Sequence, residues 1–141
     1  MKKKAVLFLC IHNSARSQMA EAFLKQYAHD RFDVMSAGIE PGILNPDAVE
    51  VMKEKGIDIS GNKTKSVFDL YKDNMTFDYV ITVCHSEAAE RCPVFPGKSL
   101  KLNWPFSDPS GFTGERDEIL EKTRKVRDDI EAAVKSFIKS Y

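Results

Sequence analysis

The sequence has no excess of charge of either sign, because 21 lysine and arginine residues are balanced by 21 aspartate and glutamate residues. Its one basic run is Lys2-Lys3-Lys4, so we expect neither nucleic acid nor a membrane as a partner. Long hydrophobic runs are also missing. The apolar stretch at residues 5–10 is ended by His12 and Asn13 and is too short for a secretory signal. Any anion that this protein binds must therefore be held by a local arrangement of groups.

Repeats, low-complexity tracts and linker-like segments are absent, and the only cysteines are Cys10, Cys84 and Cys92. Without an export signal, these cysteines predict a reducing, cytoplasmic environment with free thiols. A content of 43% hydrophobic and 30% charged residues excludes a disordered chain and a membrane protein. The 141 residues predict a single domain over 1–141 that builds its core without disulfides or structural metals, and we expect a monomer.

Short apolar runs alternate with helical stretches along the chain, which predicts a parallel sheet with helices on both faces. We expect strands at residues 5–9, 32–36 and 78–83 and around 100–102. Helices are expected at about 17–28, from Pro46 (capped by Asn45) to Gly56, from Ser86 as the cap to 91, and at 115–139, whereas residues 60–77 give no clear pattern. The predicted fold class is α/β, a three-layer, four-stranded parallel sheet of the flavodoxin-like kind.

This fold predicts where chemistry takes place, because ligands of such sheets bind at the carboxyl ends of the strands. Cys10 ends the first expected strand, Cys84 follows the third, and Asp108 lies just after the fourth. Parallel strands bring these three residues to one edge of the sheet. For Asp108 an alternative is an ordinary Asp-Pro turn with Pro109.

The segment from Cys10 to Ser17 has the spacing of an oxyanion-binding loop, with five residues between a cysteine and Arg16. The backbone N–H groups of Ile11, His12, Asn13, Ser14 and Ala15 can curl into an anion-binding nest, to which the following helix adds its positive end. Arg16 matches two oxygens of a tetrahedral anion, and its charge is expected to lower the pKa of Cys10. We expect the Ser17 hydroxyl to hydrogen-bond the Cys10 thiolate and Asn13 to brace the loop. The alternative is a small buried cysteine followed by a polar turn.

Residues 9–21, Leu-Cys-Ile-His-Asn-Ser-Ala-Arg-Ser-Gln-Met-Ala-Glu, resemble the opening of the thioredoxin-coupled arsenate reductases. That family shares the fold of the low-molecular-weight protein tyrosine phosphatases. The likeness continues through Ser36-Ala37-Gly38, residues 44–46 and 56–60, and Asp108-Pro109, and so spans most of the chain. Gln18 and the residues after it are similar to the reductase branch, because the phosphatases usually have proline after the serine.

The loop alone is compatible with a phosphatase or a reductase, since both reactions begin with attack by the Cys10 thiolate and both can use Asp108 as general acid. Reduction of arsenate to arsenite additionally needs two electrons, and hence further thiols. From the residues alone, Cys84 could equally be a packed residue and Cys92 a chance surface thiol. A zinc site at Cys84, His85 and Cys92 is disfavoured, because adjacent ligands cannot easily share one metal.

The resemblance implies a three-cysteine relay, with Cys10 as nucleophile, Cys84 as second thiol and Cys92 as resolving thiol. It also implies that reduced thioredoxin supplies the electrons, that no cofactor is bound, and that phosphate or sulfate can act as analogues of arsenate. If residues 84–92 form one helix, its ends lie about 12 Å apart, beyond the roughly 4.4–6.8 Å between the Cα atoms of a disulfide. We therefore predict that this helix unwinds on oxidation.

Some relatives bind potassium through residues similar to Asn13, Glu21 and Ser36 together with an aspartate. Here Lys65 aligns near that aspartate, and its ammonium could replace the cation, so we predict no metal site. Two other functions remain open. One is a low-molecular-weight protein tyrosine phosphatase that works through a Cys10 phospho-enzyme, and the other is a non-catalytic oxyanion or redox sensor that signals through residues 84–92.

Overall fold

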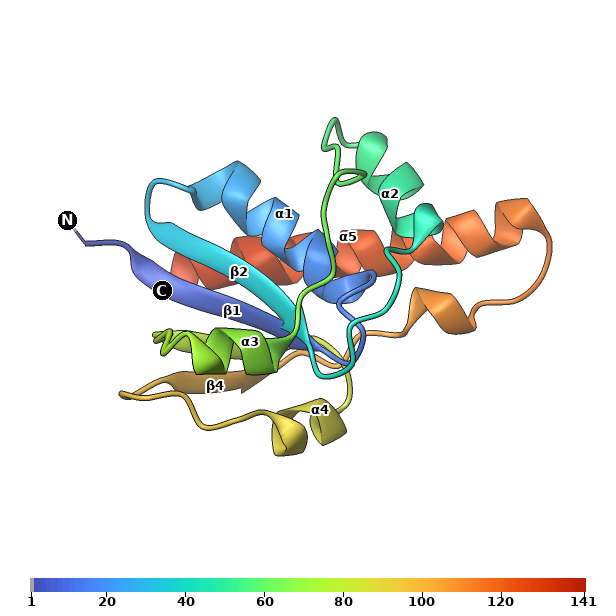
Figure 1. The fold of residues 1–141 in the computed structure, drawn as a ribbon. Helices are drawn as coiled ribbons and strands as arrows, with labels where there is room; N and C mark the ends of the chain where they lie inside the picture. Colours follow the sequence, from blue (N-terminus) through green and yellow to red (C-terminus); the bar gives the residue numbers. More distant parts are fainter. Residues whose placement is uncertain (1) are drawn as a thin grey trace.

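The computed structural model describes residues 2–141, except for the side chains of Ser86 and Glu87. Four parallel strands form one sheet in the order β2-β1-β3-β4 (Figure 1). They are β1 (Lys4–Cys10), β2 (Phe32–Gly38), β3 (Tyr79–Thr82) and β4 (Leu100–Asn103). This is the expected flavodoxin-like order, in which the chain reverses direction across the sheet between β1 and β3. The predicted fold class is confirmed.

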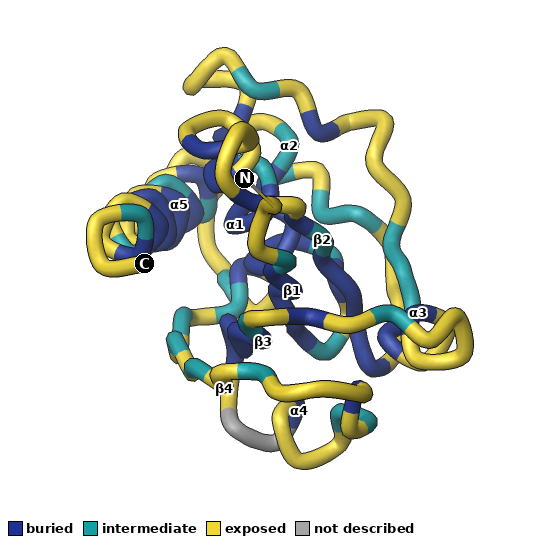
Figure 2. Tube along the Cα trace, turned by 90° about the vertical axis from the view of Figure 1, so that its left-hand side faces the viewer, coloured by how far each residue is buried: buried dark blue, intermediate teal, exposed yellow. Residues whose placement is uncertain are grey.

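Helices cover both faces of the sheet (Figures 1 and 2). They are α1 (Arg16–Ala28), α2 (Pro46–Lys53), α3 (Val67–Lys72), α4 (Ser86–Arg91) and α5 (Arg116–Ser140), with a short 3-10 helix at Pro109–Gly111. α1 and α5 pack against each other on one face, and α2 packs against α5. α3 and α4 lie on the opposite face. Within residues 2–141, no helix combines the length and the apolar character that crossing a membrane requires.

The core is built around β1, whose residues Val6–Leu9 are fully buried because the strand is covered on both faces. On one side β1 pairs with β2, which places Cys10 opposite Gly38. On the other side Leu9 pairs with Thr82 of β3. Cys84 lies two residues beyond the end of β3, so the register brings it to the edge at which Cys10 ends β1.

The structure differs from the sequence-based expectation in four main places. α3 occupies part of the unassigned stretch 60–77, and the Ser66 side chain caps it by accepting a hydrogen bond from Phe68 N. β2 extends two residues further than expected, to Gly38. α2 ends at Lys53 rather than at Gly56, which adopts a left-handed φ of 75° after the helix. α4 has His85 at the capping position, and the expected capping role of the Ser86 side chain lies outside the described part of the chain.

Candidate active site

Four backbone carbonyls at the end of β1 and in the loop after it bond to one neighbouring segment. The carbonyls of Cys10, Ile11, His12 and Ser14 accept hydrogen bonds of 2.7–3.1 Å from N–H groups within residues 39–45. In contrast, the N–H groups of residues 12–18 donate to no described group. With the carbonyls held outward and the first turn of α1 adding its N–H groups, the loop has the polarity of an anion-binding nest.

Asn13 fixes the shape of this loop. Its backbone has a left-handed φ of 55°, which asparagine tolerates better than most residues. The side chain is fully buried and uses every hydrogen-bonding group: Nδ2 donates to Ser17 Oγ at 2.8 Å and to Ser36 Oγ at 2.9 Å. Oδ1 accepts from Lys65 N at 2.9 Å and from Gln18 Nε2 at 3.1 Å. Asn13 therefore ties the loop to α1, β2 and the segment before α3, and its predicted bracing contacts are present.

Gly38 lets the loop lie directly against the end of β2. A Cβ atom at this position would lie 2.6 Å from Ile11 O and 2.9 Å from Asn13 N, closer than a side chain tolerates. In the sequence, Gly38 was notable only as part of the resemblance, although a glycine near the end of a strand can indicate that another backbone segment approaches closely.

Glu21, Ser36 and Lys65 form a polar group behind the loop. Ser36 Oγ donates to Glu21 Oε1, and Lys65 Nζ lies 3.8 Å from the same oxygen. The lysine ammonium thus stands beside the carboxylate, as expected from the alignment. Among the residues that the structure describes, no three or more His, Cys, Asp or Glu side chains are grouped to hold a metal ion.

Arg16 is buried and reaches from α1 to the loop after β4. Its Nη1 donates to Phe106 O at 3.1 Å, and its Nη2 lies 3.5 Å from Asp108 Oδ2. The other carboxylate oxygen of Asp108 accepts a hydrogen bond from Ser110 N at 2.9 Å and so caps the short 3-10 helix. Asp108 is therefore both a turn residue and a carboxylate at the edge of the site, half-exposed beside the guanidinium.

The Cys10 and Cys84 side chains are almost fully buried, with exposed fractions of 3% and 1%, and each shifts the pKa of the other. Cys84 Sγ also lies 3.7 Å from His85 O, to which its thiol can donate. A hydrogen bond from the Cys84 thiol lowers the pKa of Cys10 to about 7, assisted by the charge of Arg16 and opposed by burial. The same hydrogen bond and burial raise the pKa of Cys84 far above its ordinary value. At neutral pH a large fraction of Cys10 is therefore thiolate, whereas Cys84 keeps its proton.

Cys92 follows α4 directly, so the six residues of this helix lie between Cys84 and Cys92 in the chain. Burial raises the pKa of Cys92, and the charge of Lys101 opposes this effect. The structure therefore brings Cys10, Arg16, Cys84 and Asp108 together and leaves Cys92 apart. All three cysteines are free thiols.

The structure also places His12 and Ser17 of the predicted loop, and the nearby aromatic residue Trp104. The His12 ring faces outward, with its Nδ1 2.9 Å from Glu40 O. Ser17 is fully buried, and its Oγ accepts from Asn13, which leaves the hydroxyl proton for another acceptor. The contact of this hydroxyl with the Cys10 thiolate stays a prediction. Trp104 packs against the rings of Phe8 and Phe106, at 5.9 and 6.4 Å between ring centres.

Comparison with known proteins shows to which family this chain belongs. Residues 5–141 match the low molecular weight phosphotyrosine protein phosphatase family. An arsenate reductase of Bacillus subtilis is 44% identical over 137 residues, which cover 97% of this chain and 96% of that protein. The chain therefore belongs to the low molecular weight phosphotyrosine protein phosphatase family.

Solved structures place the similarity within a branch of that family. An arsenate reductase in its phosphate-binding state superposes with a TM-score of 0.77 at 32% identity, covering 97% of this chain and 98% of its own. A thioredoxin-dependent arsenate reductase from Corynebacterium glutamicum gives a TM-score of 0.65 at 32% identity, over 99% of this chain and 64% of its own. These relatives are arsenate reductases, and the resemblance identified in the sequence is confirmed.

Proposed function

We propose that this protein reduces arsenate to arsenite by a relay of its three thiols and that thioredoxin reduces the final disulfide. The observation that carries the proposal is that Cys84 is buried at the same edge of the sheet as Cys10, near enough that the two thiols shift each other's pKa. A phosphatase needs only the cysteine beneath the bound anion, whereas a reductase needs a second thiol that can reach the first sulfur. The relatives named arsenate reductase, one of them thioredoxin-dependent, support the same function.

In the first step, the N–H groups of the loop and Arg16 bind arsenate, and the Cys10 thiolate attacks arsenic. A sulfur–arsenic bond forms and one oxygen leaves as water, with Asp108 as the proposed proton donor. Cys84 Sγ then attacks Cys10 Sγ and forms a disulfide. The sulfur–arsenic bond breaks, arsenic takes its electron pair, and arsenite is released.

The contact between the two cysteines also explains the order of these steps. While Cys10 is a thiolate, its charge holds the proton of Cys84 and keeps the pKa of Cys84 high. Once Cys10 is bonded to arsenic, that charge is gone, and Cys84 can lose its proton more easily. We infer that Cys84 becomes nucleophilic only after the arsenic adduct has formed.

The third step requires α4 to rearrange. Cys92 attacks Cys84 Sγ, the Cys84–Cys92 disulfide forms, and Cys10 leaves as a thiolate. A helix of six residues rises about 9 Å along its axis, so the two cysteines cannot reach disulfide distance while α4 stays helical. Thioredoxin then reduces the new disulfide by thiol–disulfide exchange, which restores Cys84 and Cys92.

Hydrolysis of phosphate esters is the second candidate function, favoured by the phosphatase family match and by a loop that suits any tetrahedral oxyanion. This reaction would need Cys10, Arg16 and Asp108 and neither of the other thiols.

Arsenate-dependent NADPH oxidation in the presence of thioredoxin and thioredoxin reductase tests the proposal. Wild type should turn over, whereas Cys10→Ser, Cys84→Ser and Cys92→Ser should not sustain turnover. If arsenate causes no oxidation and aryl phosphate hydrolysis requires Cys10 alone, the phosphatase is the correct function. Arsenite formed only with glutathione and glutaredoxin would leave the reaction in place and replace the electron donor.

A further inference from the structure

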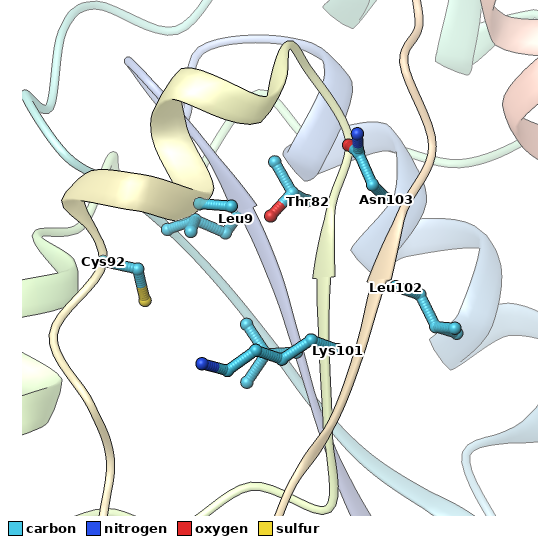
Figure 3. Close-up of a pocket in the computed structure, with 8 residues that line it drawn as sticks. Leu9, Thr82, Cys92, Lys101, Leu102 and Asn103 are labelled. Carbon is cyan, nitrogen blue, oxygen red and sulfur yellow. The ribbon is translucent and has the colours of Figure 1, made fainter.

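A small cavity lies between α4 and the sheet, beside Cys92 (Figure 3). Its volume is about 130 Å³, and its lining is largely apolar, with Leu9 and Val80 from the strands and Ala89 from α4. Four polar side chains also line this space: Cys92 from the end of α4, Thr82 from β3, and Lys101 and Asn103 from β4. Lys101 is the charged one. Leu9 directly precedes Cys10, so the cavity extends from Cys92 towards the strand end that bears the catalytic pair.

Lys101 is the charged group best placed to act on Cys92. A second, larger hollow that Cys92 also lines is bordered by Lys101 together with Lys98. The neighbouring charged residue on α4, Arg91, is turned away and pairs with Glu40 at 2.8 Å. Of the described charged side chains, only Lys101 borders Cys92 in both spaces.

We propose that Lys101 is a positioning residue of the resolving step, whose ammonium, beside Cys92 in both spaces, favours the thiolate form of Cys92 that attacks the disulfide. This inference rests on the proposed function, in which Cys92 attacks Cys84 Sγ of the Cys10–Cys84 disulfide. In that step the Cys92–Cys84 bond forms, the Cys10–Cys84 bond breaks, and Cys10 leaves as a thiolate. One disulfide replaces another, so no outside oxidant is needed.

Burial and the charge of Lys101 have opposite effects on the pKa of Cys92. An apolar lining favours the neutral thiol and raises the pKa of Cys92, and the Lys101 ammonium counteracts this. Since only the thiolate attacks a disulfide, the lysine increases the reactive fraction of Cys92. Because Lys101 is exposed, we expect salt to weaken its effect.

Alkylation of Cys92 tests this charge effect without arsenate. In a Cys10→Ser, Cys84→Ser background, Cys92 is the only thiol, and its rate with iodoacetamide is measured from pH 6 to 10. Lys101→Met should move the midpoint to higher pH by about 0.5 and lower the rate at pH 7 roughly threefold. Lys101→Arg should restore the rate, and Lys98→Met is the matched control. An unchanged midpoint in Lys101→Met, or an equal change in Lys98→Met, would overturn the proposal.

A single turnover with arsenate, without thioredoxin, separates this proposal from the proposed function. Acid quenching and mass spectrometry distinguish the Cys10–Cys84 disulfide from Cys84–Cys92. Lys101→Met should release arsenite as fast as wild type but pass on its disulfide roughly threefold more slowly. Equal exchange rates would overturn the role of Lys101. If wild type released no arsenite, the proposed function would fail, and the alkylation midpoints would still decide the effect of Lys101 on Cys92.

Discussion

Replacing Asn13 by glycine should destabilise the protein much more than the same replacement at an exposed asparagine. Glycine adopts the left-handed φ of 55° at this position without strain, so the substitution removes the side chain and leaves the backbone conformation allowed. Four buried hydrogen bonds disappear, to Ser17, Ser36, Gln18 and Lys65. At about 0.5–1.5 kcal/mol each, their loss should lower the free energy of unfolding by about 2–6 kcal/mol.

Asn74 provides the matched control, because it is the only other described non-glycine residue with positive φ, at 57°. It is exposed, and its side chain makes no hydrogen bond to any described group. Asn74→Gly should therefore change the free energy of unfolding by less than about 0.5 kcal/mol. The comparison isolates the hydrogen-bond network from the general effect of placing glycine at a left-handed position.

Urea unfolding followed by the fluorescence of Trp104, the only tryptophan, measures both variants. Protection of Cys10 from alkylation by phosphate reports the loop itself and should weaken in Asn13→Gly alone. Equal losses of stability in the two variants would refute the reasoning, because the four hydrogen bonds would then contribute nothing. Unimpaired phosphate protection in Asn13→Gly would show that the loop keeps its shape without its side-chain network.

Three further predictions concern the anion site. Alkylation of Cys10 should slow as the pH falls through about 7, because the thiolate is lost there, and Cys84→Ala should move this midpoint to higher pH; an unchanged midpoint would contradict the hydrogen bond between the thiols. Gly38→Ala should abolish phosphate protection of Cys10, since its Cβ would lie 2.6 Å from a loop carbonyl oxygen. Gly42→Ala, with its nearest contact at 3.4 Å, should bind phosphate within about twofold of wild type, and equal binding by both variants would exclude the steric argument. Asp108→Asn should slow aryl phosphate hydrolysis by roughly 100-fold at unchanged circular dichroism, and a loss below threefold would remove it as general acid.

The sequence predicts the parts of this molecule that depend on local pattern. The apolar run of β1, the Asn45-Pro46 start of α2 and the amphipathic α5 were each predictable to within a few residues. α3 was not, because it lies in the largely polar stretch 60–77, which shows no clear pattern, and its stability comes from the Ser66 cap and the burial of Val67 and Leu70.

In the site, the spacing of Cys10 and Arg16 between a predicted strand and a predicted helix was enough to predict the loop. The contacts that the loop residues make with the rest of the chain could not be predicted from this spacing. Arg16 donates to Phe106 O and Asn13 accepts from Lys65 N, and both partners lie more than 50 residues away along the chain. Gly38 lies beside the loop because Cys10 and Gly38 are in register on neighbouring strands. Such long-range pairs follow from strand order and register, which a single sequence leaves open.

The oxyanion loop and α4 differ in how strongly their contacts hold them in place, and the proposed relay requires this difference. The oxyanion loop is fixed by the Asn13 network, by the outward hydrogen bonds of its carbonyls and by close packing on Gly38. α4 is short, lies over a cavity rather than a filled core, and is held at its end by an exposed Arg91–Glu40 ion pair of the kind that contributes about 0–1 kcal/mol. An isolated helix of six residues is unstable in water, and among the described side chains of α4 only Ala88 is buried, so we expect α4 to unwind at little cost. In the proposed relay, oxidation then moves Cys92 to Cys84 while the sheet and the anion site keep their geometry for the next arsenate.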